Sequence, residues 1–177
     1  MHSSAILNLE KFFSIYLKNF NNPKILDFGS QSLSDHIGSK ILLDKMNINY
    51  EYTGVDIEKG NNVDIVLGDP YSFKEIPDST YDVIISTSVF EHVEFFWLTY
   101  LEILRILKPN GIFYFNVPSN GDFHRWPQDC WRFYPDSGNA LIKWAKRNNF
   151  NPILLESYVS KQYLECGWND YVSVTLK

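Results

Sequence analysis

The spacing of apolar positions changes repeatedly along the chain, and each change predicts a new element. In the first twenty residues, apolar side chains recur every three or four positions, which predicts an amphipathic helix. Further along, helical spacing alternates with short apolar runs bounded by Gly, Pro, Asn or Asp, as in an α/β protein. The expected helices are 3–20, 34–46, 94–107 and 136–148, and the expected strands are 24–28, 50–56, 62–70, 81–87, 112–117, 152–158 and 170–176.

The connections refine this pattern. The N-terminal helical stretch, 1–22, is expected to place its apolar face over the sheet or at the mouth of a ligand site, with a partner-binding helix as the alternative. The residues between Asp69 and Tyr81 include two prolines and leave room for one helical turn rather than a crossover helix. Lys108–Gly111 follows the third helix, and a Gly after a basic last turn predicts a helix stop there.

Three successive strands end in an acidic residue. Asp27 lies on the first strand, Asp56 ends the second and Asp69 follows the third. In a parallel sheet the carboxyl ends of the strands border the ligand crevice, and an acid on the second strand can accept both ribose hydroxyls of a nucleoside. Asp27 needs a hydrogen-bond partner or a cationic ligand group, unless it caps the next helix. Gly29 lets the backbone approach a ligand, so a valine there is expected to block binding and leave the fold intact.

These motifs resemble those of class I S-adenosylmethionine-dependent methyltransferases. I-L-D-F-G-S corresponds to the first motif, V-D-I to the ribose acid and G-D-P to the adenine-contacting acid. Y-D-V-I-I-S-T-S-V-F-E-H-V matches the fourth strand, and I-L-R-I-L-K-P-N-G-I-F-Y-F-N-V-P matches the following helix and fifth strand. The resemblance covers Lys24–Val117. It departs at the family's Gly-x-Gly-x-Gly turn, of which only Gly29 remains.

The resemblance implies a Rossmann-like three-layer α/β sandwich. Its seven-stranded, mostly parallel sheet has the order 3-2-1-4-5-7-6, with strand 7 antiparallel. It also implies S-adenosyl-L-methionine as cofactor and S-adenosyl-L-homocysteine as product. The cofactor-binding residues that it implies are Asp27, Gly29, Ser30, Asp56, Ile57, Gly68, Asp69, Pro70, Thr87, Ser88 and Glu91.

Composition narrows the classes of partner. A chain of 177 residues predicts one domain, 1–177, and the net charge of −5 disfavours a nucleic-acid partner held through its phosphates. Aromatic residues make up 16% of the chain and gather between Phe90 and Tyr134. This favours a walled small-molecule pocket over a flat surface; the alternative is an aromatic-rich core.

The two cysteines form no disulfide framework and show no metal-ligand spacing, so no metal ion is expected. Without a signal peptide or a membrane span, a cytoplasmic protein is expected; the oligomeric state is left open.

The segment 118–136, after the fifth strand, is expected to select the acceptor. It contains G-D-F-H-R-W-P-Q-D-C-W-R-F-Y-P-D, which is similar to H-R-x-P-x-D-x-W-R-F-x-P segments of small bacterial methyltransferases, several associated with surface-polysaccharide biosynthesis. The alternative is a structural loop in which Asp129 pairs with a neighbouring arginine. The candidate catalytic residues are His124 as base, Asp129 as its orienter and His92 third; the candidate substrate-binding residues are Arg125, Trp126, Trp131 and Arg132.

The leading hypothesis is methyl transfer to an oxygen of a small polar acceptor, either a carbohydrate or a phosphorylated metabolite. One alternative is methylation of nitrogen or of a macromolecule, although no N-P-P-[YF]-type motif follows the fourth strand. A second alternative is a non-catalytic binding module that kept the fold and lost the glycine-rich turn.

Overall fold

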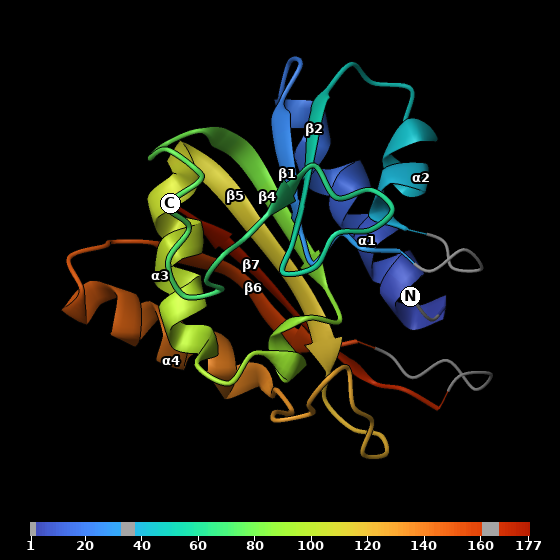
Figure 1. Ribbon diagram of the computed structural model, residues 1–177, viewed down its shortest axis with the longest axis vertical. Coiled ribbons are helices and arrows are strands. Elements are labelled where there is room, and N and C mark those ends of the chain that lie inside the picture. Colours follow the sequence, from blue (N-terminus) through green and yellow to red (C-terminus); the bar gives the residue numbers. More distant parts are fainter. Residues whose placement is uncertain (1–2, 33–37, 161–166) are drawn as a thin grey trace.

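A seven-stranded sheet forms the centre of the computed structural model, which describes residues 3–32, 38–160 and 167–177 (Figure 1). The strands are β1 (Lys24–Phe28), β2 (Glu51–Asp56), β3 (Ile65–Val66), β4 (Tyr81–Thr87), β5 (Leu107–Pro118), β6 (Ile153–Val159) and β7 (Asp170–Leu176). The helices are α1 (Ser3–Tyr16), α2 (Ser39–Asp44), α3 (Phe96–Ile106) and α4 (Pro135–Arg147), with short 3-10 helices η1 (Leu17–Asn19) and η2 (Phe90–His92).

The strand order is β3-β2-β1-β4-β5-β7-β6, as the resemblance predicted. The pairs from β3 to β5 are parallel, and β7 runs antiparallel to both β5 and β6. Consequently β1, β2, β4 and β5 all end at the same edge of the sheet. In this arrangement ligands bind at the carboxyl ends of the strands.

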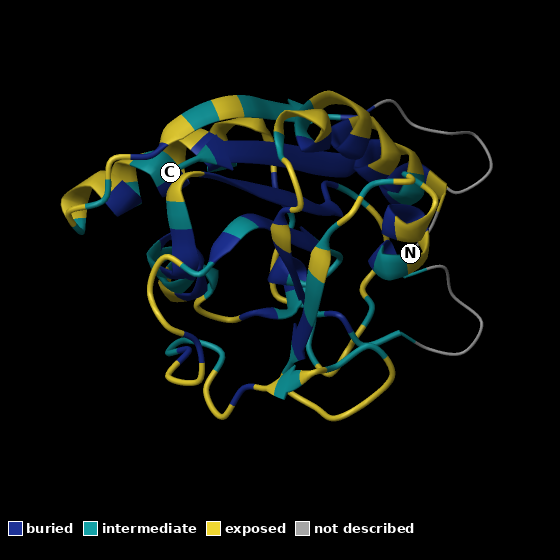
Figure 2. Cartoon of the chain, turned by 90° about the horizontal axis from the view of Figure 1, so that it is seen from above, coloured by how far each residue is buried: buried dark blue, intermediate teal, exposed yellow. Residues whose placement is uncertain are grey.

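Helices cover both faces of the sheet and make it the middle layer (Figures 1 and 2). On one face, α1 and α2 bury Leu9, Phe13 and Leu43 against strand residues such as Val83. On the other face, α3 packs Tyr100 and other apolar side chains in a core cluster that includes residues of α4. The apolar face of the first helix therefore lies on the sheet, one of the two positions that the sequence predicted.

The third helix and the fifth strand meet at a boundary that the sequence prediction placed wrongly. The helix ends at Ile106, and Leu107 already pairs with Tyr81 of β4. Between Leu107 and Ile112 the register shifts because Lys108–Gly111 forms a bulge within the strand, with Asn110 at a φ of 63°. Lys108 Nζ donates to both carboxylate oxygens of Asp82, at 2.9 and 2.8 Å, which ties the bulge to β4.

Other boundaries shift by smaller amounts. The helical turn of α1 continues only as the 3-10 helix η1 beyond Tyr16, and β3 contains two residues of the longer run 62–70. The expected start of the second helix and His36 lie outside the described residues; the described part of that helix is α2. Residues 71–80 form turns, so the short connection before β4 is confirmed.

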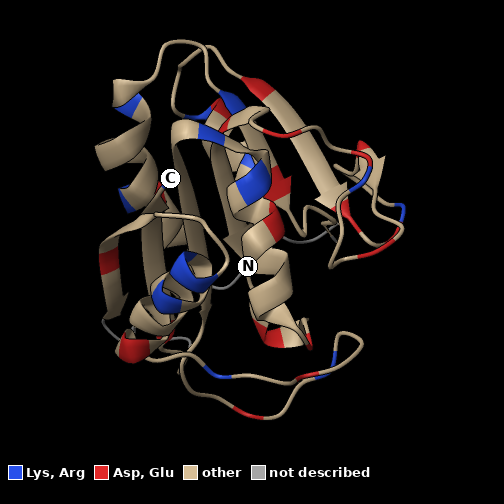
Figure 3. Cartoon of the chain, turned by 90° about the vertical axis from the view of Figure 1, so that its left-hand side faces the viewer, with Lys and Arg blue, Asp and Glu red and all other residues tan. Residues whose placement is uncertain are grey.

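Basic and acidic residues both occur along the elements on the side of the molecule that carries α3 and α4 (Figure 3). None of the helices in the described ranges is long and apolar enough to cross a membrane.

Candidate active site

A cavity of about 750 Å³ lies at the carboxyl ends of β1, β2, β4 and β5. Its walls come from the turn after β1 (27–32), the end of β2 (56–58), the residues after β4 (87–94), the loop 124–128 and Trp168. This volume is within the usual range for a small-molecule site, about 300–1,000 Å³. The cavity therefore combines the strand ends with the segment that the sequence assigned to acceptor selection.

The turn after β1 is shaped by its backbone. Gly29 N and Ser30 N donate to Val55 O at 2.8 and 3.1 Å, and Gly29 has a φ of +81° that disfavours other residues. A Cβ at this position would lie 2.1 Å from Val89 Cγ2. The expectation that Gly29→Val leaves the fold intact is therefore wrong, because a valine would clash with Val89 before it reached any ligand.

Asp27 is buried on β1 and lines the cavity. Its carboxylate accepts a hydrogen bond from the Tyr52 hydroxyl at 3.0 Å. Burial raises the pKa of Asp27 to about 7, although the hydrogen bonds to its side chain act in the opposite direction. The partner that the sequence required for this acid is therefore a tyrosine of the neighbouring strand.

Asp56 ends β2 with its carboxylate fixed by backbone donors. Gln31 N donates to Oδ2 at 3.0 Å, and Ile57 N donates to Oδ1 at 2.8 Å. Oδ1 also accepts a longer hydrogen bond from Glu58 N at 3.4 Å, so Oδ2 keeps the freer lone pair. Asp56 and Ile57 both line the cavity. The second strand thus presents an oriented acceptor of hydrogen bonds, as a ribose site requires.

Two hydroxyls in the same wall remain available. Ser30 Oγ and Ser88 Oγ are buried, line the cavity, and have no hydrogen-bond partner in the described part of the chain. A buried hydroxyl without a partner is costly, so these two atoms fit a polar ligand in the cavity. Thr87 lines the cavity beside Ser88.

The G-D-P motif contributes less to the cavity than the sequence predicted. Pro70 lines it, whereas Gly68 and Asp69 do not. Asp69 Oδ1 accepts a hydrogen bond from Tyr71 N at 2.8 Å and so holds its own turn. The role of Asp69 toward adenine stays a prediction, and Tyr71 lines the cavity beside Pro70.

Two histidines and a buried glutamate meet in the part of the cavity wall that η2 and the loop 124–128 form. Glu91 and His92 lie on η2, and His124 lies on the β5–α4 segment (residues 119–134); all three line the cavity. The rings of His92 and His124 are perpendicular, with centroids 5.1 Å apart. His92 Nε2 lies 3.7 Å from Glu91 Oε1, and Glu91 Oε2 is buried without a hydrogen-bond partner among the described atoms.

The surroundings of these residues set their protonation. Burial raises the pKa of Glu91 to about 8, and burial lowers the pKa of His92. His92 Nδ1 makes a short contact with the backbone carbonyl of Gln128, which can only accept. His92 Nδ1 therefore carries the hydrogen, and Nε2 keeps its lone pair. His124 Nδ1 lies 3.2 Å from Asp122 O and 3.5 Å from Asp129 Oδ2, which favour a hydrogen on Nδ1, and 3.5 Å from Arg132 Nη2, a donor that favours a lone pair there.

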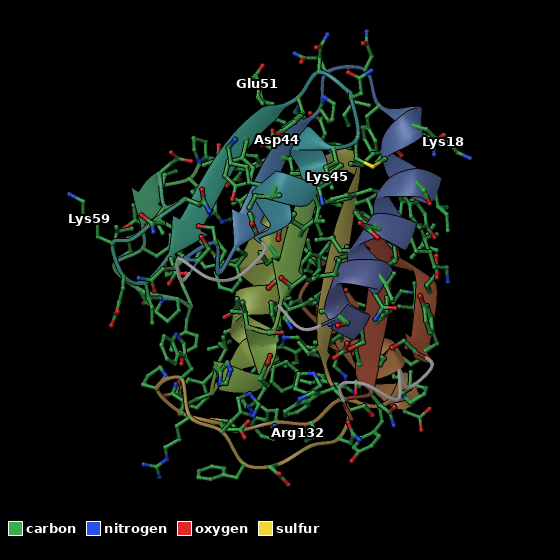
Figure 4. All side chains as sticks on the ribbon, turned by 90° about the vertical axis from the view of Figure 1, so that its right-hand side faces the viewer. Lys18, Asp44, Lys45, Glu51, Lys59 and Arg132 are labelled. Carbon is green, nitrogen blue, oxygen red and sulfur yellow. The ribbon has the colours of Figure 1, made fainter. Side chains whose placement is uncertain are left out.

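The β5–α4 segment is anchored by Arg132 and Asp129. Arg132 pairs with Asp129 through both guanidinium nitrogens, at 2.5 and 2.8 Å, and also donates to Asp122 O at 2.9 Å. Figure 4 shows Arg132 on this segment beneath the sheet. The hydrogen bond from Arg132 holds the pKa of Asp129 at about 2. This pairing corresponds to the structural alternative for the two residues, and neither lines the cavity.

The remaining candidates for substrate binding are partly inside and partly outside the cavity lining. Arg125 and Trp126 line the cavity. Trp131 lies outside the lining; its indole donates to Val93 O at 3.1 Å, and its ring packs against Phe96. The assignment of Arg132 and Trp131 to the acceptor remains a prediction. The contacts of Trp131 hold the segment against Val93 and α3, whereas those of Arg132 lie within the segment.

Several lining residues were missed by the sequence prediction. Trp168 precedes β7 and packs edge-to-face on His124, with ring centroids 5.3 Å apart. Gln128 bonds His92 through both its backbone carbonyl and its side-chain amide, the latter donating to His92 O at 2.8 Å. The expected topology already put the start of β7 at the ligand edge, so it could have indicated Trp168; no local signal marks Gln128.

Comparisons with known proteins agree with this architecture. A protein-family model described as a methyltransferase domain matches residues 37–115. A search of curated proteins finds no match to the sequence. The comparison with solved structures finds 1,6-didemethyltoxoflavin-N1-methyltransferase from Burkholderia thailandensis, with 1,6-didemethyltoxoflavin and S-adenosylhomocysteine bound, at 15% identity and a TM-score of 0.66, covering 98% of this chain and 78% of that one.

Two further structures have a similar fold. A SAM-dependent methyltransferase from Archaeoglobus fulgidus has 16% identity and a TM-score of 0.63, with 97% of this chain and 94% of that chain covered. The CurJ carbon methyltransferase has 14% identity and a TM-score of 0.68, with 97% and 53% covered. At these identities the likenesses show the fold. Together with the domain match, they confirm the predicted resemblance, and S-adenosylmethionine is the cofactor that this domain and fold imply.

Proposed function

We propose that this chain, a class I methyltransferase by its domain match and its fold, transfers a methyl group from S-adenosylmethionine to an oxygen of a small polar acceptor. The observation that carries the proposal is the single cavity shared by the ends of β1 and β2 and by the two histidines. A methyl donor and an acceptor must meet in one enclosed space, because the transfer is an in-line displacement between them.

The end of the cavity at β1 and β2 fits the cofactor. Asp56 offers oriented carboxylate lone pairs for ribose hydroxyls, and the Gly29 turn brings backbone to the cavity wall. Ser30 and Ser88 offer the buried hydroxyls described above. The cofactor would supply the activated methyl group; the chain supplies position and electrostatics.

The other end of the cavity fits the acceptor. His124 is the first candidate for the general base: its Nε2 can take a proton from an acceptor hydroxyl, and its Nδ1 faces the Asp129 carboxylate. His92, with its Nε2 lone pair, is the next candidate base. Trp126, 61% exposed, offers an apolar ring to the body of the acceptor.

The charges of the lining favour a neutral acceptor. Among the described lining residues, carboxylic acids outnumber cations, and Arg125 is the one Lys or Arg. An acidic wall suits the positive sulfonium of the cofactor and repels a highly anionic acceptor. A carbohydrate hydroxyl therefore fits better than a phosphorylated metabolite, whose phosphate would depend on Arg125. A role in surface-polysaccharide biosynthesis is consistent with this acceptor class.

Two measurements, made one after the other, test the proposal. Calorimetry with S-adenosylmethionine and S-adenosylhomocysteine tests the cofactor end, and a binding module that lost its cofactor would give no heat with either. A methyl-transfer assay against sugars, nucleotide sugars, phosphorylated metabolites and amines tests the acceptor end. The first similar structure is an N1-methyltransferase and another a carbon methyltransferase, so turnover of amines alone would replace oxygen by nitrogen as the acceptor.

A further inference from the structure

We infer that Glu91, His92 and His124 form a binding site for one divalent transition-metal cation. One candidate ligand atom from each residue lies within 4.8 Å of those of the other two. The three residues are buried, or partly buried, in the wall of the cavity. Two imidazoles and one carboxylate with open positions form a set that binds first-row transition ions such as Fe²⁺.

The buried carboxylate is the first reason to expect a cation. The Glu91 side chain is 1% exposed, and its Oε2 has no hydrogen-bond partner in the described ranges. Its Oε1 faces His92 Nε2 at 3.7 Å, a distance too long for a hydrogen bond. Its carboxyl group accepts one backbone hydrogen bond, from Glu91 itself, which leaves Oε2 unsatisfied. A buried carboxylate oxygen without a partner is costly, and a cation between these atoms would satisfy both this oxygen and the imidazole.

The groups behind the histidines are an independent second reason. Histidines that bind metals usually donate their other ring N–H to a backbone carbonyl or a carboxylate, which fixes the ring and the tautomer. His92 Nδ1 has the carbonyl of Gln128 in this position. His124 Nδ1 has Asp122 O at 3.2 Å and the Asp129 carboxylate at 3.5 Å. The His92 ring is therefore held with Nε2 available as ligand, and the carbonyl and the carboxylate beside His124 Nδ1 favour the same arrangement in the second ring.

Nearby charges do not oppose the cation. Arg132 Nη2 lies 3.5 Å from His124 Nδ1, but the guanidinium is paired with both oxygens of Asp129. The acidic excess of the cavity lining adds further attraction. The ligands come from two segments 32 residues apart, so no metal-ligand spacing was visible in the sequence, and the expectation of no metal ion followed from that.

The site also specifies the acceptor, and this step rests on the proposed function. A cation held by three protein ligands in the cavity wall would keep open positions for acceptor oxygens. A bound hydroxyl would lose its proton to water more easily, since a divalent cation lowers its pKa. His92 and His124 then act as ligands rather than as bases. The acceptor class would be compounds with a coordinating hydroxyl, such as vicinal diols and hydroxy acids.

The test measures Mn²⁺ binding to the chelator-treated, full-length protein by electron paramagnetic resonance, with no cofactor or acceptor present. We expect one saturable site per chain. Glu91→Gln and His124→Ala should each weaken it at least about 10-fold, as is usual even for residues that only support a metal ligand. Glu94→Gln changes another cavity-lining carboxylate outside the cluster and should bind Mn²⁺ as the wild type does.

Three outcomes would overturn the site: no saturable Mn²⁺ or Zn²⁺ binding, unchanged binding in both Glu91→Gln and His124→Ala, or equal loss in Glu94→Gln. Because His124 is 39% exposed, its truncation should leave the fold intact even if Glu91→Gln misfolds, and circular dichroism checks both variants. S-adenosylhomocysteine binding is measured separately. Absence of S-adenosylhomocysteine binding would refute the proposed function, and the Mn²⁺-binding result could still be interpreted by itself.

Discussion

The two ends of the cavity are built in different ways. The cofactor end is formed by backbone groups and by one acid at the tips of neighbouring strands, where Gly29 N and Ser30 N bond Val55 O and Asp56 accepts from Gln31 N. The acceptor end is formed by side chains of η2, the β5–α4 segment and Trp168. The parallel sheet alone brings the first set together, whereas the second depends on contacts between distant segments.

This difference predicts that the two ends can be changed separately. The acceptor end is held by bonds such as Cys130 N to Glu91 O at 2.8 Å and Gln128 Nε2 to His92 O at 2.8 Å. None of these bonds involves the turn after β1 or the end of β2. Variants at one end should therefore leave the ligand of the other end bound.

The largest effect should come from His124→Ala. As a base, His124 would take the acceptor proton; as a metal ligand, it would hold the cation that makes the acceptor hydroxyl more acidic. General-base assistance alone is typically worth about 10²–10⁴-fold in rate. We expect single-turnover methyl transfer to fall by that factor, while calorimetry gives an unchanged affinity for S-adenosylhomocysteine. A wild-type rate with a raised acceptor KM would mean that His124 only binds the acceptor, and an equal loss of cofactor affinity would contradict the separation of the two ends.

The next effect should come from Asp56→Ala. Loss of charge-assisted hydrogen bonds to the ribose should cost about 1.5–3 kcal/mol, or roughly ten- to hundred-fold in cofactor affinity. Asp56→Asn keeps one acceptor oxygen, so its cofactor affinity in calorimetry should lie between those of the wild type and of Asp56→Ala. Asp69→Ala tests the predicted adenine contact in the same measurement; because Asp69 does not line the cavity and its carboxylate accepts from Tyr71 N, we expect a smaller loss there than at Asp56. A larger loss at Asp69 than at Asp56 would refute the ribose assignment.

The same contrast explains how much could be predicted from the sequence. Short apolar runs that end in acids mark strand tips, and the resemblance supplied the strand order. The prediction of the sheet is therefore confirmed, and Asp27, Gly29 and Asp56 line the cavity at the strand ends where the sequence placed them. The boundary of β5 was not, since Lys108–Gly111 resembles a helix stop. Its participation in the strand depends on pairing with β4 and on Lys108 reaching Asp82.

The acceptor end could be predicted only in part. Local composition marked His124, Arg125 and Trp126 as candidates, and all three line the cavity. Composition could not decide that Arg132 would turn toward Asp129, because both a ligand and a neighbouring carboxylate satisfy a guanidinium. Nor could it indicate that Gln128 fixes the tautomer of His92, which depends on the path of the backbone 36 residues away.

A smaller effect is expected on stability, from Asp27→Asn. Burial raises the pKa of Asp27 to about 7, above its unfolded value of about 3.8, so the folded protein holds this proton more tightly. Its contribution to stability is therefore present below about pH 4 and is lost as the pH rises toward 7. In Asp27→Asn, the midpoint of thermal unfolding should fall less between pH 5 and pH 8 than in the wild type. An identical pH dependence in both proteins would show that Asp27 is ionised throughout.

The smallest effect should come from Trp126→Ala, which removes one aromatic wall of the acceptor end. The ring is 61% exposed and lines the cavity, so truncation should cost about 1 kcal/mol of acceptor binding, or roughly five-fold in KM, with little change in kcat. Phe123→Ala is the matched control: Phe123 belongs to the same segment, is 70% exposed and lies outside the cavity lining. Steady-state kinetics with the identified acceptor should therefore separate the two aromatics. An equal rise in KM for both variants would mean that the effect comes from loosening of the segment, and a loss of cofactor affinity in Trp126→Ala would show that its ring reaches across to the cofactor end.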